Sequence, residues 1–324
     1  MTAAVLAGYA VLAAVALPRL LGRATWAERA PRLAIAMWQA AGVSAVASAL
    51  LAALTVAVPT AGLGHTLTRF FLTCAAALTT GSPAFPPFAT GVPSMTGGLV
   101  GLAAAGLVAG RVAWCGGRVV LGARRERRRH VEGLALLGRH DGDLGAIVVD
   151  YDERLAYCVP GRHGHTVITT AALRSLTAEQ VAAVLAHERA HLRGRHHLVL
   201  AAAETLARAF PGVPLFERSR AEQVRLVELL ADDVAARRHP RVHLAAALVS
   251  LATGRAPAFT LGAGGQTALT RVRRMLHPQA PLGRTERLSG LLAVGLLLGG
   301  PAAVAFLPAL TTFVTHCCHT LLGS

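Results

Sequence analysis

Long apolar runs alternate with polar segments along this chain, and the pattern defines its architecture. Four of the runs are 18 residues or longer: 1–18, 33–58, 96–115 and 288–310. An α-helix needs about 20 apolar residues to cross the roughly 30 Å hydrocarbon core of a bilayer, so each run is near the required length. The first run also lacks the positively charged start of a cleavable signal peptide. The pattern predicts a mainly α membrane protein with four transmembrane helices.

The segment between the third and fourth runs has the polarity and length of one soluble domain. Three short stretches rich in β-branched residues predict strands: 146–150, 155–159 and 165–169. Helical periodicity follows them, so we expect an inserted α+β domain with a small β-sheet. The predicted parts are a membrane region at 1–118, the domain at 119–283, and a last part at 284–324 with the fourth helix and a short tail.

The arginines predict how the chain is oriented in the membrane. They collect at 19–32, after the first run, and at 118–129, after the third, whereas residues 59–95 carry only Arg69. Cytoplasmic loops of membrane proteins are enriched in basic residues. We therefore expect the N-terminus, the 59–95 connection and the C-terminal tail outside, and the domain in the cytosol.

The composition of the chain is typical of a membrane protein. Hydrophobic residues make up 53 % of the chain, charged residues 15 %, and the mean hydropathy is +0.49. The net charge of +15 raises the question of nucleic acid. A nucleic-acid binder presents its basic residues with a reading or stacking element, and the cluster at 124–129 has none. We therefore expect no direct nucleic-acid partner, and a membrane-anchored nucleic-acid binder is the weaker alternative.

The five cysteines form no CxxC pair. Neither a disulfide framework nor a cysteine-ligated zinc site is predicted. Cys317 and Cys318 are adjacent and flanked by two histidines. They are either tail residues without a partner or a redox or metal sensor at the membrane surface.

The candidate chemistry lies at 187–191, which reads His-Glu-Arg-Ala-His. On a helix, His187 and His191 project from one face with Glu188 beside them, which is the pattern of zinc hydrolases. Thr177 followed by Gln180 forms a capping-box signal, so a helix is expected to begin there. A catalytic zinc ion, one per chain, takes three protein ligands and activates water, with Glu188 as general base.

The third zinc ligand has two candidates. His197 completes the longer HExxHxxGxxH pattern through Gly194, but the Met-turn of that class is missing, since Met275 is the only later methionine. Glu228 and Asp232 lie four residues apart on one face of a predicted helix. Glu228 could bind the metal while Asp232 accepts a hydrogen bond from a ligand histidine. The leucines around them indicate a buried helix, where unpaired carboxylates would be costly.

The chain resembles the gluzincin membrane peptidases at this point. The motif HERAH is followed about forty residues later by ELLAD, with apolar spans on both sides of the domain. Within this group it is most similar to the BlaR/MecR-type antirepressor metallopeptidases, with the HtpX-type quality-control proteases as relatives. The resemblance implies a gluzincin-like domain in which His187, His191 and Glu228 bind zinc, Glu188 is catalytic and Asp232 supports a ligand. The β-lactam sensors of this type carry an extracellular penicillin-binding domain after the last span. The sequence ends at Ser324 without one, so we expect no sensing of that kind.

Two weaker hypotheses concern the surroundings of the site. His239 or His243 could donate a hydrogen bond to the oxyanion of the reaction. The strand at 165–170, if it lies at the sheet edge, could pair with an extended substrate.

The sequence therefore predicts a multi-pass zinc endopeptidase of a bacterial cell membrane that cleaves a protein or peptide substrate. That substrate is a cytosolic transcriptional repressor in a signalling pathway or, alternatively, a membrane protein under quality control. A non-catalytic signal transducer with a peptidase-like domain is the third hypothesis.

Overall fold

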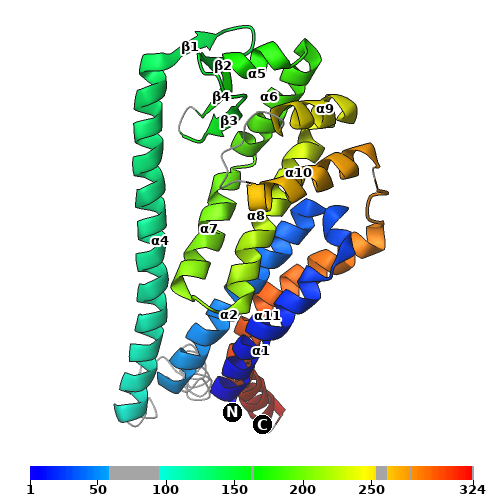
Figure 1. The fold of residues 1–324 in the computed structure, drawn as a ribbon. Coiled ribbons are helices and arrows are strands. Elements are labelled where there is room, and N and C mark those ends of the chain that lie inside the picture. The colour runs from blue at the N-terminus through cyan, green and yellow to red at the C-terminus, as the bar shows by residue number, and fades with distance from the viewer. Residues whose placement is uncertain (58–94, 162–163, 253–260, 278, 323–324) are drawn as a thin grey trace, which may run out of the picture.

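The computed structural model is dominated by helices (Figure 1). It describes residues 1–57, 95–161, 164–252, 261–277 and 279–322. Four of the described helices are long and apolar enough to cross a membrane. They are α1 (Thr2–Gly22), α2 (Pro31–Ala57), α4 (Met95–Leu137) and α11 (Arg284–Leu322). The expected connection outside the membrane falls at 58–94, beyond the described residues, as do the side chains of Cys317 and Cys318.

Helix α4 is much longer than the expected third span. It continues without a break for 43 residues, through the arginine cluster and up to the sheet. At 1.5 Å per residue this helix is about 65 Å long. Arginine favours helix, and no proline interrupts the segment. The boundary expected at residue 118 therefore lies inside one continuous helix.

The sheet has four strands in the order β1-β2-β4-β3. They are β1 (Gly138–Asp141), β2 (Ala146–Val149), β3 (Ala156–Val159) and β4 (His165–Thr169). The β2–β4 pair is parallel, and the other two pairs are antiparallel. Strand β4 is interior, contrary to the hypothesis that it forms an edge, and four of its five residues are buried, as fits a strand covered on both faces. The edge next to it is β3. Strand β1 is polar and was not expected from the sequence.

Six shorter helices follow the sheet: α5 (Thr170–Ser175), α6 (Ala178–Arg193), α7 (His196–Ala209), α8 (Pro214–Ala235), α9 (Arg241–Ala252) and α10 (Leu261–Leu276). The expected start of α6 is confirmed, because Thr177 and Gln180 form a complete capping box. The glycine-rich composition of 256–267 predicts a loop, but residues 261–267 belong to helix α10. Residues 256–260 lie outside the description.

Helices α7 and α8 form a hairpin that packs along the bundle instead of standing apart from it (Figure 1). One apolar core joins Trp38 and Ala41 of α2 to Leu215, Phe216 and Leu226 of α8. On the other side, α7 packs against α4. The peptidase-like segment and the bundle are therefore one packed unit.

A buried polar link fastens this unit together. The Gln39 amide of α2 donates to Gln223 of α8 at 2.5 Å and to the Val199 carbonyl of α7 at 3.1 Å. Gln223, 1 % exposed, donates in turn to Ser219 at 2.6 Å. Buried amides are stable only when hydrogen-bonded, so this network fixes α8 relative to α2.

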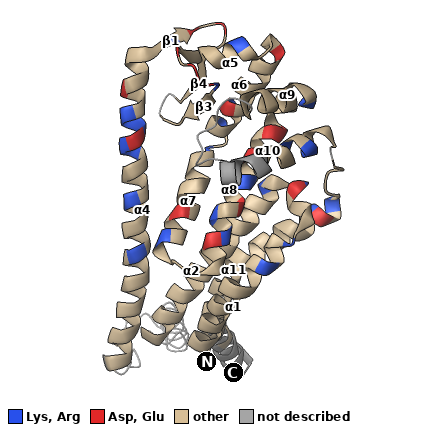
Figure 2. Ribbon diagram, viewed as in Figure 1, with Lys and Arg blue, Asp and Glu red and all other residues tan. Residues whose placement is uncertain are grey.

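Charged residues gather at the sheet end of the bundle, and the opposite end of the described helices is almost free of them (Figure 2). This asymmetry agrees with the arginine pattern of the sequence. The turn between α1 and α2 lies at the same end of the bundle as the sheet (Figure 1).

Candidate metal centre

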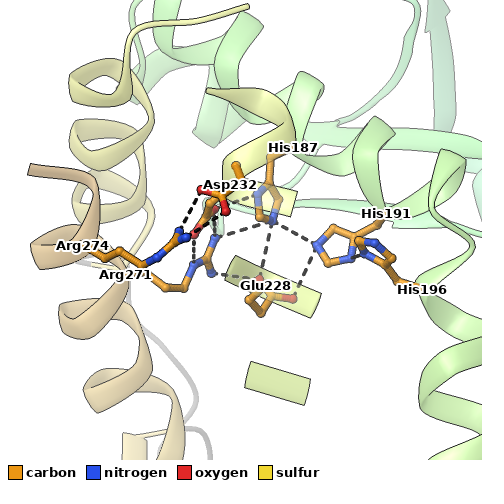
Figure 3. Close-up of polar contacts among 8 residues, drawn as sticks. His187, His191, His196, Glu228, Asp232, Arg271 and Arg274 are labelled. Atoms are coloured by element: carbon orange, nitrogen blue, oxygen red, sulfur yellow. Dashed lines mark hydrogen bonds and ion pairs between the residues drawn. The ribbon is translucent and has the colours of Figure 1, made fainter. Parts of the chain in front are cut away.

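Helices α6 and α8 bring three metal-binding side chains together. His187 and His191 come from successive turns of α6, and Glu228 faces them from α8 (Figure 3). One ligand atom of each lies within 4.8 Å of the others, and it is the one such group of three found in the described part of the chain. His187 is buried, and the other two are partly buried.

The separations between these atoms suit a tetrahedral zinc ion. His187 Nε2 lies 3.1 Å from His191 Nε2 and 3.5 Å from Glu228 Oε2, and His191 Nε2 lies 3.4 Å from Glu228 Oε1. Zinc–nitrogen bonds of 2.0–2.1 Å at tetrahedral angles put two ligand atoms about 3.3 Å apart. Two imidazoles and a carboxylate are also a usual zinc ligand set. The residues present therefore fit zinc.

Asp232 lies on the Nδ1 side of the His187 ring. Its Oδ1 lies 2.9 Å from His187 Nδ1, although the ring N–H is not aligned with it as a hydrogen bond. The Asp232 side chain is only 1 % exposed. A carboxylate on the Nδ1 side leaves Nε2 of His187 directed toward the ligand group. The predicted role of Asp232, to support a ligand histidine, stays a prediction.

Arg271 of α10 contacts both carboxylates of the group, and no pattern in the sequence predicts it. Its Nε and Nη2 donate to the two oxygens of Asp232 at 2.8 and 2.7 Å, and its Nη1 lies 2.9 Å from Glu228 Oε2. Glu228 and Asp232, on successive turns of α8, thus contact the same guanidinium group (Figure 3). The available signal was the buried carboxylate pair itself, because buried carboxylates need a cation.

The other candidate ligand, His197, is not part of the group of three found among the described residues. Helix α6 ends at Gly194, Arg195 adopts a left-handed conformation with φ 49°, and α7 then begins at His196. Burial, then the charges of Arg127 and Arg195, lower the pKa of His197. Among the described residues Glu228, and not His197, joins the two histidines of α6.

His196 contributes to the centre instead, and it too was missed. Its Nδ1 lies 3.0 Å from Nδ1 of His191, and it is 4 % exposed. One of these two nitrogens donates and the other accepts. This contact orients the His191 ring and directs its Nε2 toward Glu228.

Comparison with protein families adds independent support. Residues 124–219 match the model of Peptidase family M48. The match covers less than a third of the chain, and it includes the sheet and the helix with His187 and His191 but ends before Glu228. No curated protein and no solved structure gave a significant match. The M48 match supports a metallopeptidase, and members of that family are typically zinc enzymes.

The structure gives the two histidines opposite pKa shifts. Burial lowers the pKa of His187, but the carboxylates of Asp232 and Glu228 outweigh it and raise that pKa to about 9. Burial dominates at His191 and lowers its pKa to about 4. The pKa values of Glu228 and Asp232 are lowered: burial would raise them, but Arg271 and His187 outweigh that effect.

The pKa of Glu188, the residue next to His187 on α6, is raised. Burial is the main cause that raises its pKa to about 7, with a contribution from the charge of Glu228. A base with a pKa near the working pH is effective at proton transfer. Cys158 of β3 is its neighbour, and burial together with the Glu188 charge raises the thiol pKa to about 12. Edge strand β3 therefore lies directly beside the candidate base.

His239 and His243 do not join the group of ligands in the described structure. His239 follows the end of α8, where its backbone N–H donates to the Ala235 carbonyl at 3.1 Å. His243 interacts electrostatically with Glu179 in the first turn of α6. Eight residues separate Glu179 from His187, or about 12 Å of helix. The oxyanion role of His239 or His243 stays a prediction.

Proposed function

We propose that this chain is a zinc-dependent integral-membrane endopeptidase. The observation that carries the proposal is the group of His187, His191 and Glu228 at tetrahedral spacing, with Glu188 next to it. The M48 match over the same helix supports peptide-bond hydrolysis. The four apolar helices and the one-sided arginine distribution support a membrane location with the site facing the cytosol.

Each residue has a defined part in this reaction. His187 and His191 would hold zinc through Nε2, and Glu228 through its carboxylate. Bound zinc lowers the pKa of water and polarises the carbonyl that is attacked. Glu188 accepts the proton of the attacking water and passes it to the leaving amine. Asp232, held by two hydrogen bonds from Arg271, keeps the His187 ring in place.

An extended substrate would pair with β3 and not with the interior strand β4. The Leu155 carbonyl accepts the Thr169 N–H at 3.0 Å, so the odd-numbered residues of this segment bond to β4. Ala156 and Cys158 therefore direct their backbone N–H and C=O groups away from the sheet. A peptide added at this edge would pass beside Glu188.

The position of the site relative to the bundle supports one of the two proposed substrate classes. Arg225, one turn before Glu228, pairs with Glu28 in the turn between α1 and α2 at 2.9 Å. The metal group thus lies within a few ångströms of the level of that turn. Membrane proteins with cytosolic segments near the bilayer fit this position, which favours quality control. A repressor substrate, as the resemblance to BlaR/MecR-type peptidases implies, would have to approach the membrane.

Zinc content and proteolysis of matched variants test the proposal. Glu188→Gln should keep zinc and lose at least a hundredfold in activity. Glu228→Ala should lose zinc, and His197→Ala should keep it. The opposite result for the last two variants would mean that the third ligand is misassigned. Full zinc and full activity in Glu188→Gln would rule out its role as base.

Proteomics of cells that carry Glu188→Gln would identify the substrate. Accumulation of intact membrane proteins supports quality control, and persistence of one cytosolic repressor supports signalling. If neither class changes while the purified protein is inactive on all peptides, the non-catalytic transducer is favoured.

A further inference from the structure

A cleft of about 460 Å³ lies between α1, α2 and α8, away from the metal group. Arg19 and Arg23 line it from the end of α1, Trp38 from α2, and Arg218 and Glu222 from α8. Arginines from segments distant in the sequence thus line one cavity.

The charges of this cleft are not balanced by protein. Its one carboxylate, Glu222, is already occupied by Arg225, which donates to it at 3.1 and 2.9 Å. Throughout the described chain, no carboxylate forms an ion pair with Arg19, Arg23 or Arg218. A concave site lined by cations without acidic partners suits an anion, and guanidinium groups match phosphate oxygens in geometry.

The level of the cleft along the bundle identifies the source of that anion. Helix α1 has 21 residues and is about 31 Å long, the thickness of a hydrocarbon core. Arg19 and Arg23 stand at its end, and the Arg19 guanidinium donates back to the Val15 carbonyl at 2.8 Å. The cleft therefore lies where lipid headgroups would be.

We propose that this cleft binds the phosphate of an anionic phospholipid headgroup. The proposal rests on the membrane insertion of α1 and α2 put forward above. Basic pockets between membrane helices on the cytoplasmic side are suited to such headgroups. A bound headgroup would bridge α1 to α8 through Arg218, ten residues, or about 15 Å, from the zinc ligand Glu228 on the same helix.

Native mass spectrometry of the full-length, zinc-loaded protein tests this. The protein in detergent is titrated with phosphatidylglycerol, with phosphatidylcholine of the same acyl chains, and with inorganic phosphate. We expect one phosphatidylglycerol to be retained and phosphatidylcholine to be lost. Each arginine near anionic lipid contributes roughly a fivefold affinity, so Arg19→Gln with Arg23→Gln should weaken retention about 30-fold. Lysine at both positions should preserve most of it.

The matched control removes two exposed arginines from α4, Arg124→Gln with Arg125→Gln, and should leave retention unchanged. An equal loss in this control, or equal retention of both lipids, would overturn the proposal in favour of diffuse attraction. Retention of inorganic phosphate as strong as that of the lipid would assign the cleft to a soluble anion. Carbonate extraction of membranes tests insertion separately: a protein that is extracted yet retains phosphatidylglycerol contradicts the insertion and not the cleft.

Discussion

Removal of Arg271 should destabilise the protein more than removal of any exposed arginine of α10. Its side chain is 14 % exposed, and it makes two hydrogen bonds to Asp232, which is 1 % exposed, and a 2.9 Å ion pair with Glu228. Arg271→Met would keep the apolar stem and leave two carboxylates without their cation. Deleting one partner of a buried ion pair costs about 3–5 kcal/mol, because the other charge stays buried.

The loss of stability caused by Arg271→Met should be smaller when zinc is bound. In metal-free protein the whole cost applies, and the temperature of unfolding should fall by roughly 10 °C. Zinc bound near Glu228 supplies positive charge to the same carboxylates. The difference between Arg271→Met and wild type should therefore narrow when zinc is added. Arg271→Lys keeps the charge but not the two-pronged geometry, so an intermediate loss is expected.

Thermal unfolding of the purified protein, with chelator and with added zinc, measures both effects. Arg273 is the control: it lies on the same helix and is exposed, so Arg273→Met should change stability by less than about 0.5 kcal/mol. If Arg271→Met melts no lower than Arg273→Met, the ion pairs do not stabilise the fold. If zinc leaves the difference between Arg271→Met and wild type unchanged, the argument that metal and guanidinium act on the same carboxylates is refuted.

Four further predictions follow from the geometry. Gln39→Leu leaves the buried Gln223 amide without its partner and should cost about 1–3 kcal/mol in thermal unfolding, and adding Gln223→Leu should restore part of it; a double variant worse than the single one would contradict this. Zinc binding to metal-free protein at pH 7.5 should release about one proton, because the His187 pKa of about 9 keeps that ring protonated until it binds metal. Calorimetry in two buffers of different ionisation enthalpy counts the proton, and a buffer-independent heat would disprove it. Ala156→Pro removes an outward N–H of β3 and should lower cleavage of extended peptides with little change in melting temperature, whereas unchanged cleavage would exclude pairing at that edge. A fragment of residues 119–283 should aggregate, since it exposes the face of α8 that packs on α2; a soluble, monomeric fragment would show that this core is dispensable.

Local patterns predicted much of the site. His187, Glu188 and His191 are close in sequence, so helical spacing alone places them on one face. Glu228 and Asp232 were proposed from the same reasoning, with the added argument that leucines beside them indicate burial. The structure brings Glu228 to the two histidines and Asp232 behind one of them.

Long-range partners escaped the same reasoning. Arg271 lies 39 residues after Asp232 in a basic helix, and nothing local distinguishes it from its exposed neighbour Arg273. Likewise β4 reads as a strand from its composition, but its interior place depends on pairing with β2 and β3 at once. The packing of α8 against α2 could not be predicted from the sequence. The apolar residues of α2 are already explained by a membrane span, and those of α8 by burial inside the domain.

The charges of the centre connect these observations. Glu188, Glu228 and Asp232 contribute three negative charges when ionised, and Arg271 contributes one positive charge. A dication would bring the sum to zero. The raised pKa of His187 reflects the same excess of negative charge, because the carboxylates of Asp232 and Glu228 favour its protonated form. Arg271 is therefore part of a charge set matched to a divalent ion, and a neutral residue in its place would leave that set with one negative charge too many.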